Sequence, residues 1–233
     1  AQAAQKGQQV DVFFRADDVA RVDKRFCRLM QLFRSQQMPL CLAVVPEWLN
    51  NADWLDMQQF CPASPLWCWH QHGWNHMNHE SQGKKSEFGS SRHREDIRKD
   101  LVNGSKHLSA ILDNLFCPVF TPPWNRCSLT TLELLEELDF LAVSRSKNAK
   151  PLYAGPLPDL AVNVDLHTRR ETDCREGWNN LFTELSEAAQ SGRIGLMLHH
   201  GRMNDAAFDF LSILLPELQS HKGVTCRTFR DLL

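Results

Sequence analysis

Short apolar runs alternate with longer amphipathic segments along the whole chain. The short runs predict strands at residues 10–14, 40–45, 66–69, 118–120, 140–143, 160–164, 194–198 and 224–226. Between them, apolar residues recur every three or four positions, which predicts helices over residues 19–37, 51–60, 92–115, 129–138, 176–191 and 204–219. Strand and helix alternate about seven times, and this alternation indicates an α/β fold with a parallel sheet.

Polar residues cluster directly after the predicted strands. Five strand ends carry groups that can bind or react, namely Asp17 with Asp18, His72 with His76, Trp124 with Arg126, Asp165, and His199. The strand ends of a β/α barrel converge on one face, whereas an open doubly wound sheet gathers only those at its switch point. Five such ends therefore favour a barrel.

Size and composition fit one globular domain. The chain has 233 residues, of which 42% are hydrophobic and 23% charged, as is ordinary for a soluble domain. Residues 1–9 are polar and rich in glutamine, so we expect a flexible N-terminal segment before a barrel domain at 10–233. No repeat or linker divides the chain.

Charge and hydropathy exclude several partners. The net charge of -2 gives no electrostatic case for binding nucleic acid or an anionic membrane. No apolar run approaches the roughly 20 residues that cross a bilayer, and no signal peptide is visible. The eight cysteines are scattered, without a Cys-x-x-Cys pair. These features favour reduced thiols and a cytoplasmic protein.

A histidine-rich stretch at residues 66–80 is the first candidate site. It holds His70, His72, His76 and His79, four of the ten histidines of the chain. One helical turn would place His72 and His76 on the same side, a spacing typical of metal ligands. Two such nitrogens and one carboxylate from elsewhere would form a catalytic metal site. The alternative is a polar surface loop without a ligand.

Two further positions carry candidate chemistry. Asp17 and Asp18 follow a predicted buried strand, and neighbouring residues point in different directions, so one can bind a metal while the other faces water. Alternatively, Asp18 only caps the next helix. His199 ends the run at 194–198, where a hydrogen-bonded core histidine is the alternative.

In these motifs the sequence resembles the polysaccharide deacetylases with a NodB-homology domain. Arg15-Ala-Asp-Asp-Val19 is similar to the first motif of the family, His72-Gly-Trp-Asn-His76 to the second, and Leu196-Met-Leu-His199 to the fifth. The resemblance implies that Asp17 is the general base and His199 the general acid. It implies that Asp18, His72 and His76 are the metal ligands.

The third and fourth motifs match less closely. The family has an Arg-x-Pro in its third motif, whose arginine pairs with the catalytic base, but this chain reads Thr121-Pro-Pro-Trp124. Arg126 and Arg15 are the candidates for the missing charge. Asp165 matches the aspartate of the fourth motif, which orients the catalytic histidine.

The resemblance implies a distorted (β/α) barrel of about seven parallel strands. It also implies a metal-dependent hydrolase that removes acetyl groups from an acetylated glycan. Zn²⁺ suits the ligand set best, and Co²⁺, Ni²⁺ and Fe²⁺ also fit. The residues expected to contact substrate lie mostly in the motif loops and are Trp74, His79, Trp124 and Arg126. Trp178 is a further candidate for lining a sugar groove.

Two alternatives remain open from the sequence. A glycan-binding pseudoenzyme of the same fold would account for the missing arginine of the third motif. A metal-dependent amidohydrolase of another class would require additional ligands at other strand ends, and His167 is the one spare candidate.

Overall fold

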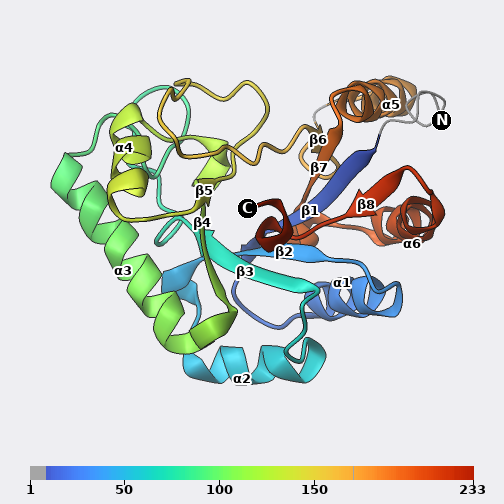
Figure 1. The fold of residues 1–233 in the computed structure, drawn as a ribbon, viewed down its shortest axis with the longest axis horizontal. Coiled ribbons are helices and arrows are strands. Elements are labelled where there is room, and N and C mark those ends of the chain that lie inside the picture. Colours follow the sequence, from blue (N-terminus) through green and yellow to red (C-terminus); the bar gives the residue numbers. More distant parts are fainter. Residues whose placement is uncertain (1–8, 170) are drawn as a thin grey trace.

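The computed structural model describes residues 9–169 and 171–233 (Figure 1). Of the segment predicted to be flexible, only Gln9 falls within these ranges, and residues 1–8 lie outside the described residues. No described helix is long and apolar enough to cross a membrane. All eight cysteines carry free thiols.

A curled parallel sheet forms the centre of the molecule. Its strands follow the order β5-β4-β3-β2-β1-β7-β6, and β8 pairs with the beginning of β1. The bounds are β1 Val10–Val19, β2 Leu40–Val44, β3 Trp67–His72, β4 Phe116–Thr121, β5 Ala142–Val143, β6 Val164–Asp165, β7 Arg193–Leu198 and β8 Val224–Cys226. The seven parallel strands of the main path confirm the predicted distorted barrel.

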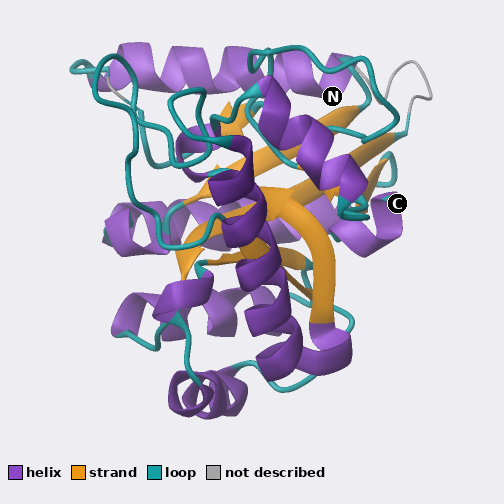
Figure 2. Cartoon of the chain, turned by 90° about the vertical axis from the view of Figure 1, so that its left-hand side faces the viewer, coloured by secondary structure: helices purple, strands orange, loops and turns teal. Residues whose placement is uncertain are grey.

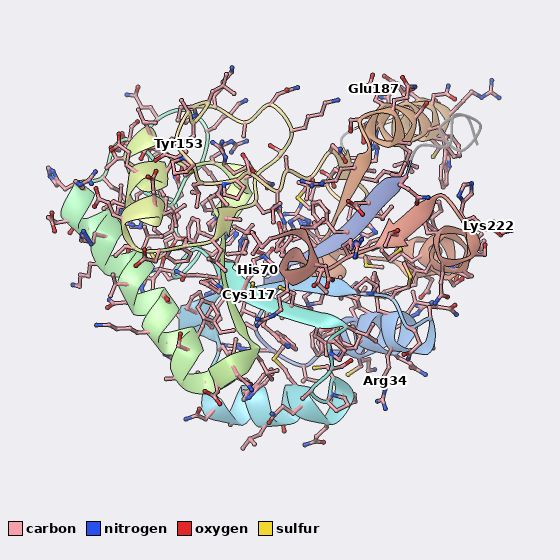
Figure 3. The ribbon with its side chains drawn as sticks, in the orientation of Figure 1. Arg34, His70, Cys117, Tyr153, Glu187 and Lys222 are labelled. Carbon is pink, nitrogen blue, oxygen red and sulfur yellow. The ribbon has the colours of Figure 1, made fainter. Side chains whose placement is uncertain are left out.

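Helices cover the outside of this sheet, namely α1 Lys24–Ser35, α2 Asn51–Phe60, α3 Arg94–Leu112, α4 Leu129–Glu137, α5 Cys174–Gln190 and α6 Asp205–Ser220. The short α7 Phe229–Leu232 lies at the centre, where Phe229 packs against Phe13 inside the barrel. Figure 2, viewed from the side of α3, shows the helices enclosing the strongly curled strands. In Figure 3, the charged residues Arg34 and Glu187 lie on the outer helices and Lys222 lies in the turn after α6, whereas His70 and Cys117 lie at the centre.

The sheet is irregular where the barrel completes its turn. The predicted strand at 160–164 is reduced to the two residues of β6, and residues 158–163 bridge β5 and β7 without regular pairing. Val143 donates its N–H to the carbonyl of Pro158, and Asn163 donates to the carbonyl of Gly195. These bonds satisfy the two facing strand edges.

The two-residue period of the strands divides their side chains between two cores. One face packs under the helices, and the other forms a smaller cluster inside the barrel that includes Phe13, Cys41, Cys68, Val119 and Phe229. Every second residue of a strand faces the interior, and these interior residues become polar toward the carboxyl ends of the strands. The site is therefore built on the interior side of the sheet.

Gly195 provides a test of this close packing. A Cβ added there would lie 2.4 Å from Cζ of Phe13 and 2.7 Å from the carbonyl oxygen of Ala161. We expect Gly195→Ala to lower the free energy of unfolding by about 1–3 kcal/mol, measured by urea denaturation. Gly201→Ala is the control, because nothing lies within 4 Å of its added Cβ. Equal stability of the two variants would contradict the packing described.

Candidate active site

The end of β1 supplies an arginine and two carboxylates. Phe13, Arg15 and Asp17 alternate along the strand, so all three face the barrel interior. Arg15 and Asp17 are buried, with 0% and 2% of their surface exposed. The backbone turns at Asp18, whose φ is 61°, and its carboxylate is partly exposed at the mouth of the barrel. Neighbouring carboxylates are thereby given different surroundings.

Arg15 and Asp17 form a two-pronged ion pair. Nε of Arg15 lies 2.8 Å from Oδ1 of Asp17, and Nη2 lies 2.8 Å from Oδ2. The guanidinium also donates to Oγ and the carbonyl oxygen of Ser144, each at 2.9 Å, and to Oδ1 of Asn125 at 2.7 Å. Burial alone would raise the pKa of Asp17, but the charge of Arg15, followed by those of His72 and His199, lowers it overall. Asp17 is therefore held as an oriented carboxylate.

Asp18, His72 and His76 converge on one point. Oδ1 of Asp18 lies 3.2 Å from Nε2 of His72 and 3.2 Å from Nε2 of His76. The ligand atoms of these three residues lie within 4.8 Å of one another, and no other group of three such residues among those described does so. Burial raises the pKa of Asp18, but the hydrogen bonds from His72 and His76 outweigh it and lower the pKa.

The tautomer of His72 indicates that a cation belongs in this cluster. Its Nδ1 lies 3.0 Å from the carbonyl oxygen of Thr121, which can only accept, so Nδ1 carries a proton. A neutral imidazole then presents the Nε2 lone pair toward the carboxylate of Asp18, which is repulsive unless a proton or metal ion lies between them. A backbone carbonyl that fixes a histidine in this way is typical of metal ligands. Two imidazoles and one carboxylate fit a divalent transition metal.

A buried glutamate supports the loop between the two histidines. Glu87 is fully buried, and its Oε1 accepts the backbone N–H groups of Trp74 at 3.1 Å and Asn75 at 2.7 Å. Gly73 has a φ of 62°, and a Cβ there would lie 2.1 Å from Oε2 of Glu87. The glycine of this motif is thus required both by backbone conformation and by the close approach of Glu87.

The loop after β4 closes the other side of the site. The Trp124 ring packs edge-on against His76, with 4.5 Å between ring centroids, and Trp48 lies 5.7 Å from the same imidazole. Asn125 accepts from Arg15 and donates to the sulfur of Met197. This loop therefore contacts a proposed metal ligand and also the ion pair.

Other residues predicted for the site lie at its margin. Nη1 of Arg126 donates to the carbonyl of Lys85, so Arg15, and not Arg126, pairs with Asp17. The Trp74 ring faces His107, with 6.3 Å between centroids. His79 is exposed, and its backbone N–H is donated to the carbonyl of Ser86. None of these contacts tests the predicted role in substrate binding.

His199 lies near Asp17, and its backbone contacts His167 rather than the predicted Asp165. The charge of His199 contributes to lowering the pKa of Asp17. Its Nδ1 is buried and has no hydrogen-bond partner among the described residues. The carboxylate of Asp165 accepts from Thr168 and from the backbone N–H of His167, and Nδ1 of His167 accepts the N–H of His199 at 3.4 Å. Asp165 thus shapes the loop that carries His167 beside His199.

Backbone strain marks the same residues. Eight described non-glycine residues have a positive φ, and four of them are Asp18, His76, Trp124 and Asn125. Such conformations cost free energy and cluster at functional sites. They are invisible in the sequence, as are the contacts of Glu87, Asn125 and Trp48. One sequence feature points to the ion pair: on a strand, the Arg-x-Asp spacing places Arg15 and Asp17 on the same side.

We expect replacement of Arg15 to destabilise the protein strongly. Arg15→Ala leaves the Asp17 carboxylate buried without its cation, and should lower the free energy of unfolding by about 3–5 kcal/mol in urea denaturation at pH 7. Arg15→Lys keeps the charge without the planar fork, and should fall between Ala and wild type.

Arg28→Ala is the matched control, because Arg28 pairs with Asp205 at the surface, where their side chains are 43% and 91% exposed. Its loss should cost no more than about 1 kcal/mol. Equal effects of Arg15→Ala and Arg28→Ala would show that the buried pair contributes no more than a surface pair.

Comparison of the sequence with protein-family models and with curated proteins finds no match. Solved structures do match. A protein from Mycobacterium smegmatis described as a polysaccharide deacetylase has a TM-score of 0.72 and 17% identity, over 97% of this chain and 89% of that one.

Two further matches belong to carbohydrate esterase family 4. An acetyl xylan esterase from Clostridium thermocellum, in complex with cobalt, gives a TM-score of 0.61 at 13% identity, over 95% of this chain and 89% of that one. A pseudoenzyme of the family from Bacillus anthracis gives 0.58 at 13% identity, over 93% and 63%. The chain therefore has the polysaccharide deacetylase (NodB-like) fold.

Proposed function

We propose that this protein is a metal-dependent carbohydrate deacetylase. The observation that carries the proposal is the convergence of two imidazole nitrogens on Oδ1 of Asp18, each at 3.2 Å, beside the buried and ion-paired Asp17. Metal ligands and an oriented carboxylate base are what hydrolysis of an acetyl amide or ester requires. The likeness in fold to polysaccharide deacetylases and carbohydrate esterases supports the same reaction class.

Asp18, His72 and His76 would hold one divalent cation. When bound, the cation would polarise the acyl carbonyl and acidify water. Zn²⁺ is our first choice for a site of two nitrogens and one oxygen, and Co²⁺, Ni²⁺ and Fe²⁺ suit the same donors. The cobalt-bound esterase supports a divalent metal without identifying which one.

Asp17 and His199 would exchange the protons. Asp17 stays ionised and oriented because Arg15 donates to both of its oxygens, so it can accept a proton from the attacking water. His199 would give a proton to the departing amine or alcohol of the sugar. Asp165 would act on His199 indirectly, through the loop that holds His167 in place.

The substrate would be an acetylated glycan or glycoconjugate. Trp124 borders the metal ligands through His76 and is our first candidate for stacking against a sugar face. Trp74, Arg126 and His79 are proposed as contacts farther along the loops. Trp48 joins them, because its ring is 37% exposed and lies beside His76.

Two alternatives have less support. A pseudoenzyme was suggested by the missing arginine of the third motif, but Arg15 supplies that charge from β1. An amidohydrolase with more metal ligands would need further clusters, and the described residues contain only the group of Asp18, His72 and His76.

Metal analysis and acetate release test the proposal. The wild-type protein should bind about one zinc ion per chain and release acetate from N- or O-acetylated oligosaccharides. Asp17→Asn should keep the metal and lower the rate by about 10²–10⁴-fold, because it removes the base. His72→Ala should lose both metal and activity.

His107→Ala is a matched control, because His107 is a partly buried histidine outside the ligand cluster. It should leave the bound metal unchanged. A wild-type protein without metal, or a His72→Ala variant that retains it, would refute the proposal. Metal binding with no acetate released from any acetylated glycan would favour the pseudoenzyme.

A further inference from the structure

A pocket beside the candidate active site has a different chemistry from the site itself. It lies between the first turns of α5 and α6 and the loop that follows β6, with a volume of about 250 Å³. In Figure 1, α5 lies beside β6 and β7, and α6 lies beside β8. The helices that follow β6 and β7 begin on the side of the carboxyl ends of those strands, which is also the side of the proposed metal site.

The walls of the pocket are mainly hydrocarbon. Eight of its ten lining residues are apolar or small, among them Leu166, Trp178, Leu181, Ala207 and Phe210. Trp178 packs edge-on against Phe210, with 5.4 Å between centroids, and it remains 47% exposed. A surface that leaves a tryptophan ring uncovered within an apolar hollow is typical of a binding site.

The two polar residues of the wall add no uncompensated charge to the pocket. Arg169 already donates to Glu184 at 2.9 Å and to Glu171 at 2.7 Å, so its charge is balanced. Burial lowers the pKa of His167 to about 4, so its imidazole is neutral at pH 7. Sugar hydroxyls buried here would find few partners, which costs free energy, whereas an alkyl or aryl group would lose nothing.

One residue of the pocket wall contacts a proposed catalytic residue. His167 forms part of its wall and accepts the backbone N–H of His199 at 3.4 Å. His199 is in turn close enough to Asp17 to affect its pKa. A group bound in the pocket is thus separated from the proposed proton donor by one residue.

We propose that this pocket binds a hydrocarbon group of the substrate, an alkyl or aryl aglycone attached to the acetylated sugar. Only the acetylated-sugar part of this substrate rests on the proposed function; binding of the hydrocarbon group does not. It narrows the substrate class from free glycans to glycoconjugates with an apolar aglycone.

Two glycosides that differ only in their aglycone test the pocket. We expect hexyl N-acetyl-β-glucosaminide to bind the zinc-loaded protein at least about tenfold more tightly than the methyl glycoside in calorimetry, because each buried methylene adds affinity. Trp178→Ala and Ala207→Phe, which open and fill the pocket, should abolish the difference. Phe60→Ala is the control: it removes an aromatic residue of α2 that is 40% exposed, and it should preserve the difference in affinity between the two glycosides.

A probe without a sugar separates this inference from the proposed function. N-phenyl-1-naphthylamine should gain fluorescence with the wild type and with Phe60→Ala, and much less with Ala207→Phe. Tighter hexyl binding without acetate release from any acetylated glycan would uphold the pocket and favour the pseudoenzyme over the deacetylase. Equal affinities of the two glycosides, or a hexyl advantage that survives both pocket variants, would overturn the inference.

Discussion

The site depends on a charge buried inside the barrel, the guanidinium of Arg15. With 0% of its surface exposed, this charge would cost much free energy of folding if it had no hydrogen-bond partners. Its partners are Asp17 on β1, Ser144 at the end of β5 and Asn125 in the loop after β4. The same bonds fix the orientation of Asp17 and tie three parts of the sheet together. Asp18 is then free to face the mouth of the barrel, where His72 and His76 meet it.

Much of this arrangement follows from elementary patterns in the sequence. Alternating apolar runs and helical periods predict the parallel strands. The predicted first strand ends at residue 14, but β1 runs on to Val19, and Arg15 and Asp17 therefore lie on the strand with Phe13 and face inward. The ligand spacing of His72 and His76 was likewise visible, although His76 reaches Asp18 from a turn with a φ of 60° and not from a helix.

Other features depend on contacts that no local pattern specifies. The choice of Arg15 over Arg126 is decided by where the loop after β4 places Arg126, whose guanidinium reaches the carbonyl of Lys85. Glu87 lies twelve residues beyond Asn75, in a polar stretch that looks like surface, and nothing in that stretch indicates its burial. The strand expected at 160–164 is mostly irregular, because residues 158–163 must bridge two strand edges.

If Asp18, His72 and His76 form one metal centre, X-ray absorption spectroscopy of the protein loaded with cobalt will show it. We expect one bound ion coordinated by two imidazoles and otherwise by oxygen donors. A sulfur ligand from any of the cysteines, or an ion bound without histidine, would contradict it.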